Sequence, residues 1–278
     1  MNAEKIYIAI DFKSSTNSVL SYAVWLSQTF ECKNLCLFHI MEYTLTPPAY
    51  LTPYINKEKK KIEEKLKKLA EQTISYVSNV EIKVVFGRLI ESIKEVMKDK
   101  IGFAVMGFKT HITRPSTSER ILKGLKMPVL IVKEENFTEF NPAAIKIKKI
   151  LCPVDFSEYS LKALNFAKNI ANKWNCELEV LHVVPEQKVR SIIEDQEERE
   201  KYINYLKENA KEQLQKINEN LRYEVVAGIP SEEIIKKSKE VDLIVIGSKG
   251  RSYTEAVIIG SVAEAVIKHS QKPVLLVH

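Results

Sequence analysis

Short apolar runs recur along the chain, and the segments between them carry apolar residues spaced as in a helix. The runs, such as those at 6–10 and 243–246, are continuous instead of alternating and rich in Ile, Val and Leu. Such runs are typical of strands that are covered on both faces of a parallel sheet. At 161–174 and 203–221 the apolar residues recur every three or four positions, which indicates amphipathic helices. The alternation of the two patterns predicts an α/β fold with a doubly wound parallel sheet.

The whole pattern occurs twice in the chain. Residues 6–12 (IYIAIDF) match residues 150–156 (ILCPVDF), which sets Asp11 opposite Asp155, 144 positions later. Both copies close on similar segments, MPVLIVK in the first and KPVLLVH in the second. The agreement includes three further pairs: His39 with His182, Gly87 with Gly228, and Gly107 with Gly247. A repeat this long predicts a duplicated Rossmann-like domain and not a solenoid unit.

We predict two domains, residues 1–135 and residues 149–278, because each copy carries the full pattern. Residues 136–148 lack periodic apolar positions and are predicted to form the linker. No basic and apolar leader opens the sequence, and no apolar run approaches the roughly 18 residues of a membrane-spanning helix. The protein is therefore expected in the cytoplasm and not in a membrane.

Charge and cysteine content argue against nucleic acid and metal as partners. The net charge of +6 arises mainly from lysines that are spread along the predicted helices. The densest basic run, residues 57–68, is interrupted by glutamates and carries Ile62 and Leu66 at helical spacing, so it is interpreted as a solvated helix face. The 4 cysteines form no CxxC pair. Cys36 and His39 would lie on opposite faces of a strand, which favours core packing over a metal site.

Glycine is scarce, with 8 in 278 residues, yet three glycines stand in residues 247–261 (GSKGRSYTEAVIIGS). Gly247 ends an apolar run, Gly250 follows three positions later, and Gly260 and Ser261 precede a helical pattern. Glycine lets the backbone turn and approach a ligand closely. Ser261 is a good capping residue, and the free N–H groups of a helix N-terminus favour a phosphate. The stretch predicts a phosphate site at the carboxyl end of a parallel strand, although its spacing matches neither a Walker loop nor GxGxxG.

The spacing G-x2-G-x9-G-S resembles that of nucleotide-binding universal stress proteins. CPVDFSEYS at 152–160, LHVV at 181–184 and GSVAEAV at 260–266 extend the resemblance, which covers both halves apart from the linker. The chain therefore resembles a tandem universal stress protein. The resemblance implies an ATP-binding regulatory or stress-protective protein, with ADP and AMP as weaker ligands and Mg²⁺ or Mn²⁺ as an accompanying ion.

The resemblance also implies a role for each residue of the second copy. Asp155 would contact the ribose, and the backbone of Val183 would meet the adenine edge. The glycines and the helix N-terminus would hold the ribose and phosphates, and Lys249 and Arg251 would attract the phosphates. The expected nucleotide site comprises Pro153, Val154, Asp155, Val183, Ile246, Gly247, Lys249, Gly250, Arg251, Gly260, Ser261 and Val262. From the residues alone, Asp155 could equally cap the next helix and the glycines could be plain turn residues.

The matching loop of the first copy departs from this spacing. It spans 21 positions from its first glycine to the closing proline, against 26 in the second copy. Thr110 takes the place of Gly250, and Pro115 takes the place of Gly260. A threonine obstructs the loop if that position needs positive φ, and a proline removes an N–H donor. We therefore predict one nucleotide per chain, bound by the second domain alone. The open alternative is a different anion site formed by three residues of the shorter loop: Lys109, His111 and Arg114.

Other functions and partners stay open at this point. The sequence contains no recognisable Ser-His-Asp set, paired carboxylates or metal-ligand cluster, so no catalytic residue is predicted. A slow ATP hydrolase or phosphotransferase, or an interaction scaffold with vestigial pockets, are the alternatives to a nucleotide-responsive regulator. The closing strand of each copy would be an exposed edge of its sheet. Similar proteins join such edges across a two-fold axis, so the two domains are expected to pack as an internal pseudo-dimer through these strands. The resemblance also allows a homodimer and an unidentified protein partner.

Overall fold

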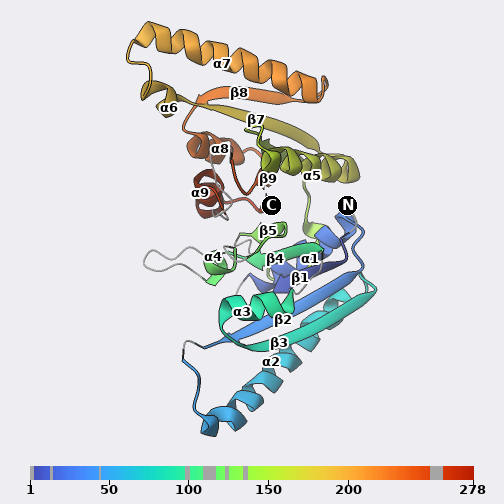
Figure 1. Ribbon diagram of the computed structural model, residues 1–278. Helices are drawn as coiled ribbons and strands as arrows, with labels where there is room; N and C mark the ends of the chain where they lie inside the picture. The colour runs from blue at the N-terminus through green and yellow to red at the C-terminus, as the bar shows by residue number, and fades with distance from the viewer. Residues whose placement is uncertain are drawn as a thin grey trace. The chain divides into compact units, whose positions relative to one another are not determined.

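The computed structural model describes residues 3–12, 15–43, 45–97, 101–108, 117–122, 125–133, 137–250 and 259–278. The chain divides into two compact units, Met1–Lys146 and Ile147–His278 (Figure 1). Each unit alternates strands and helices in the order that the sequence predicted. The domain boundaries at 135 and 149 remain predictions.

The N-terminal unit contains β1 (Lys5–Ala9), α1 (Thr16–Thr29), β2 (Asn34–Glu42), η1 (Ala49–Leu51), α2 (Thr52–Thr73), β3 (Asn79–Gly87), α3 (Leu89–Val96), β4 (Gly102–Gly107), α4 (Thr117–Leu122), β5 (Val129–Val132) and η2 (Pro142–Ala144). Its strands lie in the order β3-β2-β1-β4-β5 and pair in parallel. The chain thus winds outward in one direction from β1 and then in the other from β4. This topology confirms the predicted doubly wound sheet.

The C-terminal unit repeats this arrangement. Its elements are β6 (Lys149–Pro153), α5 (Glu158–Trp174), β7 (Glu177–Pro185), α6 (Glu186–Arg190), α7 (Gln196–Ile217), β8 (Tyr223–Gly228), α8 (Pro230–Ser238), β9 (Leu243–Gly247), α9 (Ser261–His269) and β10 (Val274–Val277). The strand order β8-β7-β6-β9-β10 is again parallel throughout. Because such crossovers are right-handed, α5 and α7 lie on one face of the sheet and α8 and α9 on the other. The internal duplication is therefore confirmed at the level of topology.

The hydrophobic pattern explains these elements. Every residue of β9 is buried, as expected for a strand covered on both faces. Helix α5 buries residues three or four positions apart, among them Ala163, Ala167 and Ile170. The second helical pattern was predicted to reach residue 221, but α7 ends at Ile217 because Asn218 adopts extended backbone angles. Leu221 is still buried, so its apolar character reflects core packing after the helix and not the helix itself.

The duplication extends to unusual backbone geometry. Phe12 and Phe156, which occupy matching positions, both take positive φ values, 58° and 64°. The bulky side chain makes this left-handed conformation unfavourable by about 1 kcal/mol or more. Helices α2 and α7 each have 22 residues and start 144 positions apart, at Thr52 and Gln196. Position-by-position comparison between the two units is therefore justified along these helices.

Part of the predicted linker packs against the N-terminal unit. The side chain of Asn17 donates a hydrogen bond to the carbonyl of Thr138 at 2.9 Å. The backbone N–H of Asn141 donates to Ser21 Oγ, also at 2.9 Å. These contacts hold residues 138–141 to helix α1. The role of residues 136–148 as a linker remains a prediction.

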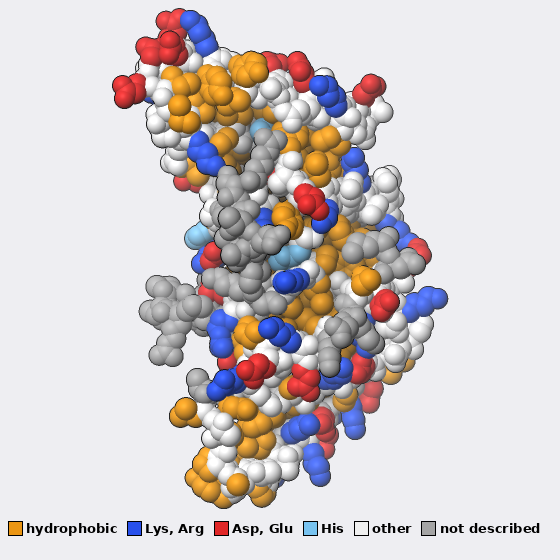
Figure 2. Space-filling model, viewed as in Figure 1, with side chains coloured by type: hydrophobic (Ala, Val, Ile, Leu, Met, Phe, Trp, Pro, Cys, Tyr) orange, Lys and Arg blue, Asp and Glu red, His pale blue; other side chains and the backbone are white. Residues whose placement is uncertain are grey.

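None of the described helices has the length and apolar character that a membrane span requires. On the visible face, basic and acidic side chains are interspersed (Figure 2). This mixture fits the interpretation of the lysine-rich helices as solvated surfaces.

A buried carboxylate ties three elements of the C-terminal unit together. Glu179 on β7 is 5% exposed, and its oxygens lie 2.6 Å from Lys149 Nζ on β6 and 3.0 Å from Lys237 Nζ on α8. Burial alone would raise the pKa of Glu179, but the two lysines outweigh it and lower the pKa. The stabilisation from this lowered pKa is present above the unfolded-state value and is lost as the pH falls through the folded-state value.

We expect Glu179→Ala to lower the free energy of unfolding by about 3 kcal/mol, because it leaves the half-buried Lys149 without its carboxylate and takes one of three carboxylates from Lys237, which still pairs with Glu224 and Glu240. Urea unfolding followed by circular dichroism measures this change. Glu177→Ala is the matched control, since Glu177 pairs with Arg222 at 3.1 Å where both side chains are more than half exposed. An exposed pair of this kind contributes less than about 1 kcal/mol. Equal losses in both variants would contradict the prediction.

Candidate functional site

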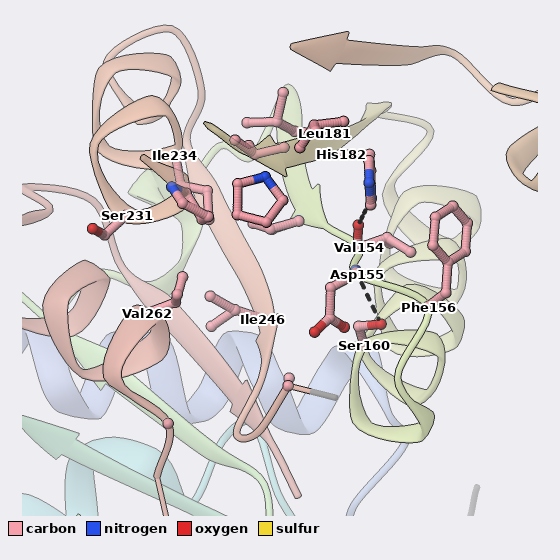
Figure 3. Close-up of a pocket in the computed structure, with 18 of the residues that line it drawn as sticks. Val154, Asp155, Phe156, Ser160, Leu181, His182, Ser231, Ile234, Ile246 and Val262 are labelled. Carbon is pink, nitrogen blue, oxygen red and sulfur yellow. Dashed lines mark hydrogen bonds between the residues drawn. The ribbon is translucent and has the colours of Figure 1, made fainter. Parts of the chain in front are cut away.

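A cavity of about 700 Å³ lies at the carboxyl edge of the sheet in the C-terminal unit (Figure 3). The ends of β6, β7, β8 and β9 line it, together with α6, α7 and the first turns of α5, α8 and α9. The winding of the sheet reverses between β6 and β9, which is where open parallel sheets hold their ligands. Every predicted site residue lines this cavity except Arg251, which lies outside the described residues. Their role in binding remains a prediction.

The Asp155 carboxylate is held by the start of helix α5. Its Oδ1 accepts hydrogen bonds from Ser157 N at 3.0 Å and from Ser157 Oγ at 2.6 Å. Ser157 is in turn the N-cap of α5, because its Oγ accepts a hydrogen bond from Ser160 N at 3.2 Å. Ser157 is therefore the residue that caps α5, and Asp155 holds Ser157 in place through these hydrogen bonds. In Figure 3 its carboxylate points toward the side of the cavity on which Ile246 and Val262 lie.

The two glycines after β9 serve different purposes. A Cβ at Gly247 would lie 2.7 Å from the carbonyl carbon of Tyr159 and 2.8 Å from Ser160 N. Gly247 therefore lets the backbone of α5 pack on the end of β9. A Cβ at Gly250 would instead lie 2.7 Å from Asp155 Oδ2, inside the cavity. None of the described glycines has positive φ, so Gly250 is needed for close approach and not for a left-handed turn.

The start of α9 differs from the prediction in one respect. Ser261 was expected to cap this helix, but the N-cap is Gly260 and Ser261 is the first helical residue, with an exposed side chain. Gly260 has ordinary extended angles, and its N–H donates to Ser248 O at 2.7 Å. An α-helix leaves the N–H groups of its first turn without intrahelical partners. Val262 and Ala263 of that turn line the cavity, so a helix N-terminus faces it.

Lys249 supplies positive charge at the same edge of the cavity. Its Nζ lies 5.5 Å from the ring centroid of Tyr159, within cation–π range. The carbonyl oxygen of Lys249 lies 3.2 Å from Ser157 Oγ and shares the single hydroxyl proton with the closer Asp155 Oδ1. The glycine loop and the start of α5 are thus fixed to each other beside Asp155.

His182 has a structural role. Its Nδ1 lies 2.7 Å from the carbonyl of Val154, and its ring packs against Phe156 at a tilt of 39°, with the centroids 4.9 Å apart. A carbonyl can only accept, so the proton resides on Nδ1. His39 makes the same contact with Ile10 O at 2.7 Å in the N-terminal unit. The matching histidines join adjacent parallel strands at their carboxyl ends.

Residues 2–133 and residues 146–278 each match the model of the universal stress protein family. The chain belongs to the universal stress protein family. It is 33% identical over 156 residues to Universal stress protein MJ0577 of Methanocaldococcus jannaschii, which covers 48% of this chain and 96% of the relative. It is 34% identical over 147 residues to Universal stress protein MJ0531 of the same organism, a match that covers 47% of this chain and 81% of the relative. Both relatives match about half of this chain, as a duplicated family member requires.

A solved universal stress protein from Archaeoglobus fulgidus has the same fold over nearly the whole chain. The TM-score is 0.71, and the match covers 98% of this chain and 95% of that chain. The sequences are 22% identical, so this likeness concerns the fold alone. The likeness extends over both units of this chain.

Several cavity residues of this universal stress protein were not predicted. Helix α7 contributes Leu206, Asn209, Ala210 and Gln213, and the first turn of α8 contributes Ser231. The sequence argument followed strand ends and glycines, which do not indicate the middle of a helix. Asn209 and Gln213 nevertheless share a helix face with buried Ala210 and Leu214. Two amide side chains on an otherwise apolar helix face were the sequence signal that could have indicated these cavity residues.

The N-terminal unit keeps only part of this site among its described residues. Phe12 and His39 retain the strand-end arrangement, and Asp11 precedes Phe12 as Asp155 precedes Phe156. Helix α2, however, carries Lys65 where α7 has Asn209, and Lys65 Nζ lies 5.6 Å from the centroid of the Phe12 ring. The predicted loop differences lie outside the described residues: Lys109, Thr110, His111, Arg114 and Pro115.

Proposed function

We propose that the C-terminal unit binds ATP and that the protein acts as a nucleotide-responsive regulatory or stress-protective protein. The observation that carries this proposal is the convergence of the Asp155 carboxylate, the Gly250 loop and the N-terminus of α9 on one cavity. The cavity volume of about 700 Å³ lies within the range of small-molecule sites. The glycine spacing typical of nucleotide-binding universal stress proteins supports the same ligand.

Each part of ATP has a matching chemical surface in this cavity. Val154, Leu181 and Ile246 form an apolar wall suited to a base (Figure 3). Asp155 offers a carboxylate that can accept hydrogen bonds from ribose hydroxyls. The first turn of α9 and the ammonium of Lys249 suit phosphates. ADP and AMP should bind more weakly because they give up part of the phosphate interaction.

A divalent ion bound with ATP would depend mainly on the nucleotide. Among the described residues, no group of three or more His, Cys, Asp or Glu side chains is placed to hold a metal. Mg²⁺ commonly binds through one or two carboxylates, water and substrate phosphates. Asp155 is a carboxylate on the cavity wall, so the residues fit Mg²⁺ or Mn²⁺ carried by the phosphates better than a protein-only metal site.

Calorimetric titration tests the proposal, and Lys249→Gln tests its phosphate end. We expect wild-type protein to bind ATP more tightly than AMP. Lys249→Gln should weaken ATP binding by about tenfold to a hundredfold and AMP binding less, since a charge-assisted hydrogen bond contributes roughly 1.5–3 kcal/mol. Lys239→Gln, an exposed lysine that does not line the cavity, is the matched control. Absence of ATP binding by the wild-type protein would refute the proposed function.

A further inference from the structure

Two amide side chains on α7 form a paired unit at the wall of the cavity. Gln213 Nε2 donates a hydrogen bond to Asn209 Oδ1 at 2.5 Å, one helical turn away. Both side chains are half-buried and both residues line the cavity. Within the described part of the chain, neither amide makes a further hydrogen bond. The Asn209 Nδ2 amino group and the Gln213 Oε1 oxygen take no part in this bond, so the pair presents a donor group beside an acceptor.

This donor and acceptor match the polar edge of one class of ligand. Adenine presents a ring nitrogen acceptor next to its 6-amino donor, and Asn and Gln side chains recognise that combination. The neighbouring residues of α7 at the cavity, Leu206 and Ala210, are apolar and suit the face of a base. A half-buried amide in such surroundings loses free energy if its remaining groups stay unpaired after water is displaced. A base edge supplies both missing partners.

The N-terminal unit lacks this pair. Lys65 occupies the position of Asn209, and Leu69 occupies the position of Gln213. A lysine ammonium offers donors and no acceptor, and leucine offers neither. Lys65 also places its ammonium 5.6 Å from the Phe12 ring centroid. The amide pair thus occurs only in the unit whose sequence keeps the full glycine spacing.

We propose that Asn209 and Gln213 determine the base specificity of the C-terminal site by binding the amino edge of adenine. This inference rests on the proposed binding of ATP. Gln213 Oε1 accepts from the 6-amino group, and Asn209 Nδ2 donates to N7. The other side of the base, which carries N1, is left to the backbone of Val183. Gln213 therefore contacts the amino group and Asn209 contacts the ring nitrogen. A ligand that lacks the amino group tests the contact of Gln213 alone.

The test compares ATP with purine riboside 5′-triphosphate, which lacks the 6-amino group, by calorimetric titration. Wild-type protein should prefer ATP about tenfold, the equivalent of one hydrogen bond. Gln213→Leu should reduce this preference to within about twofold, because the acceptor for the amino group is gone. Asn209→Leu should weaken both ligands alike, because both retain the ring nitrogen. Gln215→Leu is the matched control, since Gln215 lies on the same helix outside the cavity and the preference should persist.

Melting curves verify that each variant is folded, and Gln213→Met replaces Gln213→Leu if the leucine variant is not. An unchanged preference for ATP in folded Gln213→Leu or Gln213→Met would overturn this inference while leaving ATP binding itself intact. A wild-type protein that binds both triphosphates equally would do the same. Failure of the wild-type protein to bind ATP would instead refute the proposed function, and this inference with it.

Discussion

Gly250→Val is expected to weaken ATP binding by about a hundredfold or more without unfolding the protein. A Cβ at Gly250 would lie 2.7 Å from Asp155 Oδ2, and valine adds two methyl groups beyond it. The carboxylate cannot simply rotate away, because Oδ1 is held by both the N–H and the hydroxyl of Ser157. Either Asp155 or the loop must shift, and both line the cavity. A loss of roughly 2.7 kcal/mol corresponds to this hundredfold change.

Calorimetric titration and thermal melting together check this result, and Gly247→Ala supplies the contrast. A Cβ at Gly247 meets the backbone of Tyr159 and Ser160, which cannot rotate aside. Gly247→Ala should therefore lower the melting temperature of the protein, whereas Gly250→Val should leave it nearly unchanged. Undiminished ATP binding by folded Gly250→Val would remove the Gly250 loop from the proposed site.

The sequence could predict the fold and the place of the site because both follow from local patterns. Continuous apolar runs marked the strands, and the repeat from Asp11 to Asp155 marked the duplication. Parallel sheets bring strand ends to one edge, so Asp155, Val183 and Gly247 were expected to lie together before any contact was known. The structure places all three at the same cavity.

The details that sequence could not predict depend on tertiary contacts. Gly247 is required by the approach of α5, which lies far away in sequence from β9. Ser261 looked like a cap, but capping depends on the residue at which helical angles begin, and that residue follows Gly260. Asn209 and Gln213 gain their significance only from the fold, since a polar pair on a helix is usually solvated. Helix propensity and hydrophobic periodicity do not indicate which residues from other elements a side chain contacts.

Each chain is expected to bind one ATP, in the C-terminal unit. The N-terminal unit retains Asp11, Phe12 and the contact from His39, so two equal sites would be the simple expectation for a duplicated protein. Lys65 changes the described part of its site, because it places an ammonium beside Phe12 and removes the acceptor and donor pair that α7 offers. In the sequence, Thr110 also replaces the glycine that gives Asp155 its room in the second copy.

Native mass spectrometry over an ATP series measures this stoichiometry. We expect saturation at one ATP per chain, since the combined changes should weaken the N-terminal unit by about a hundredfold or more. Gly250→Val should then leave little bound ATP at concentrations that saturate the wild-type protein, which assigns the bound nucleotide to the C-terminal unit. Two ATP molecules of similar affinity, with one remaining in Gly250→Val, would show that the N-terminal unit binds nucleotide through a differently built loop. In that case Lys109, His111 and Arg114 become the residues to replace first, because they are the basic side chains between Gly107 and Pro115.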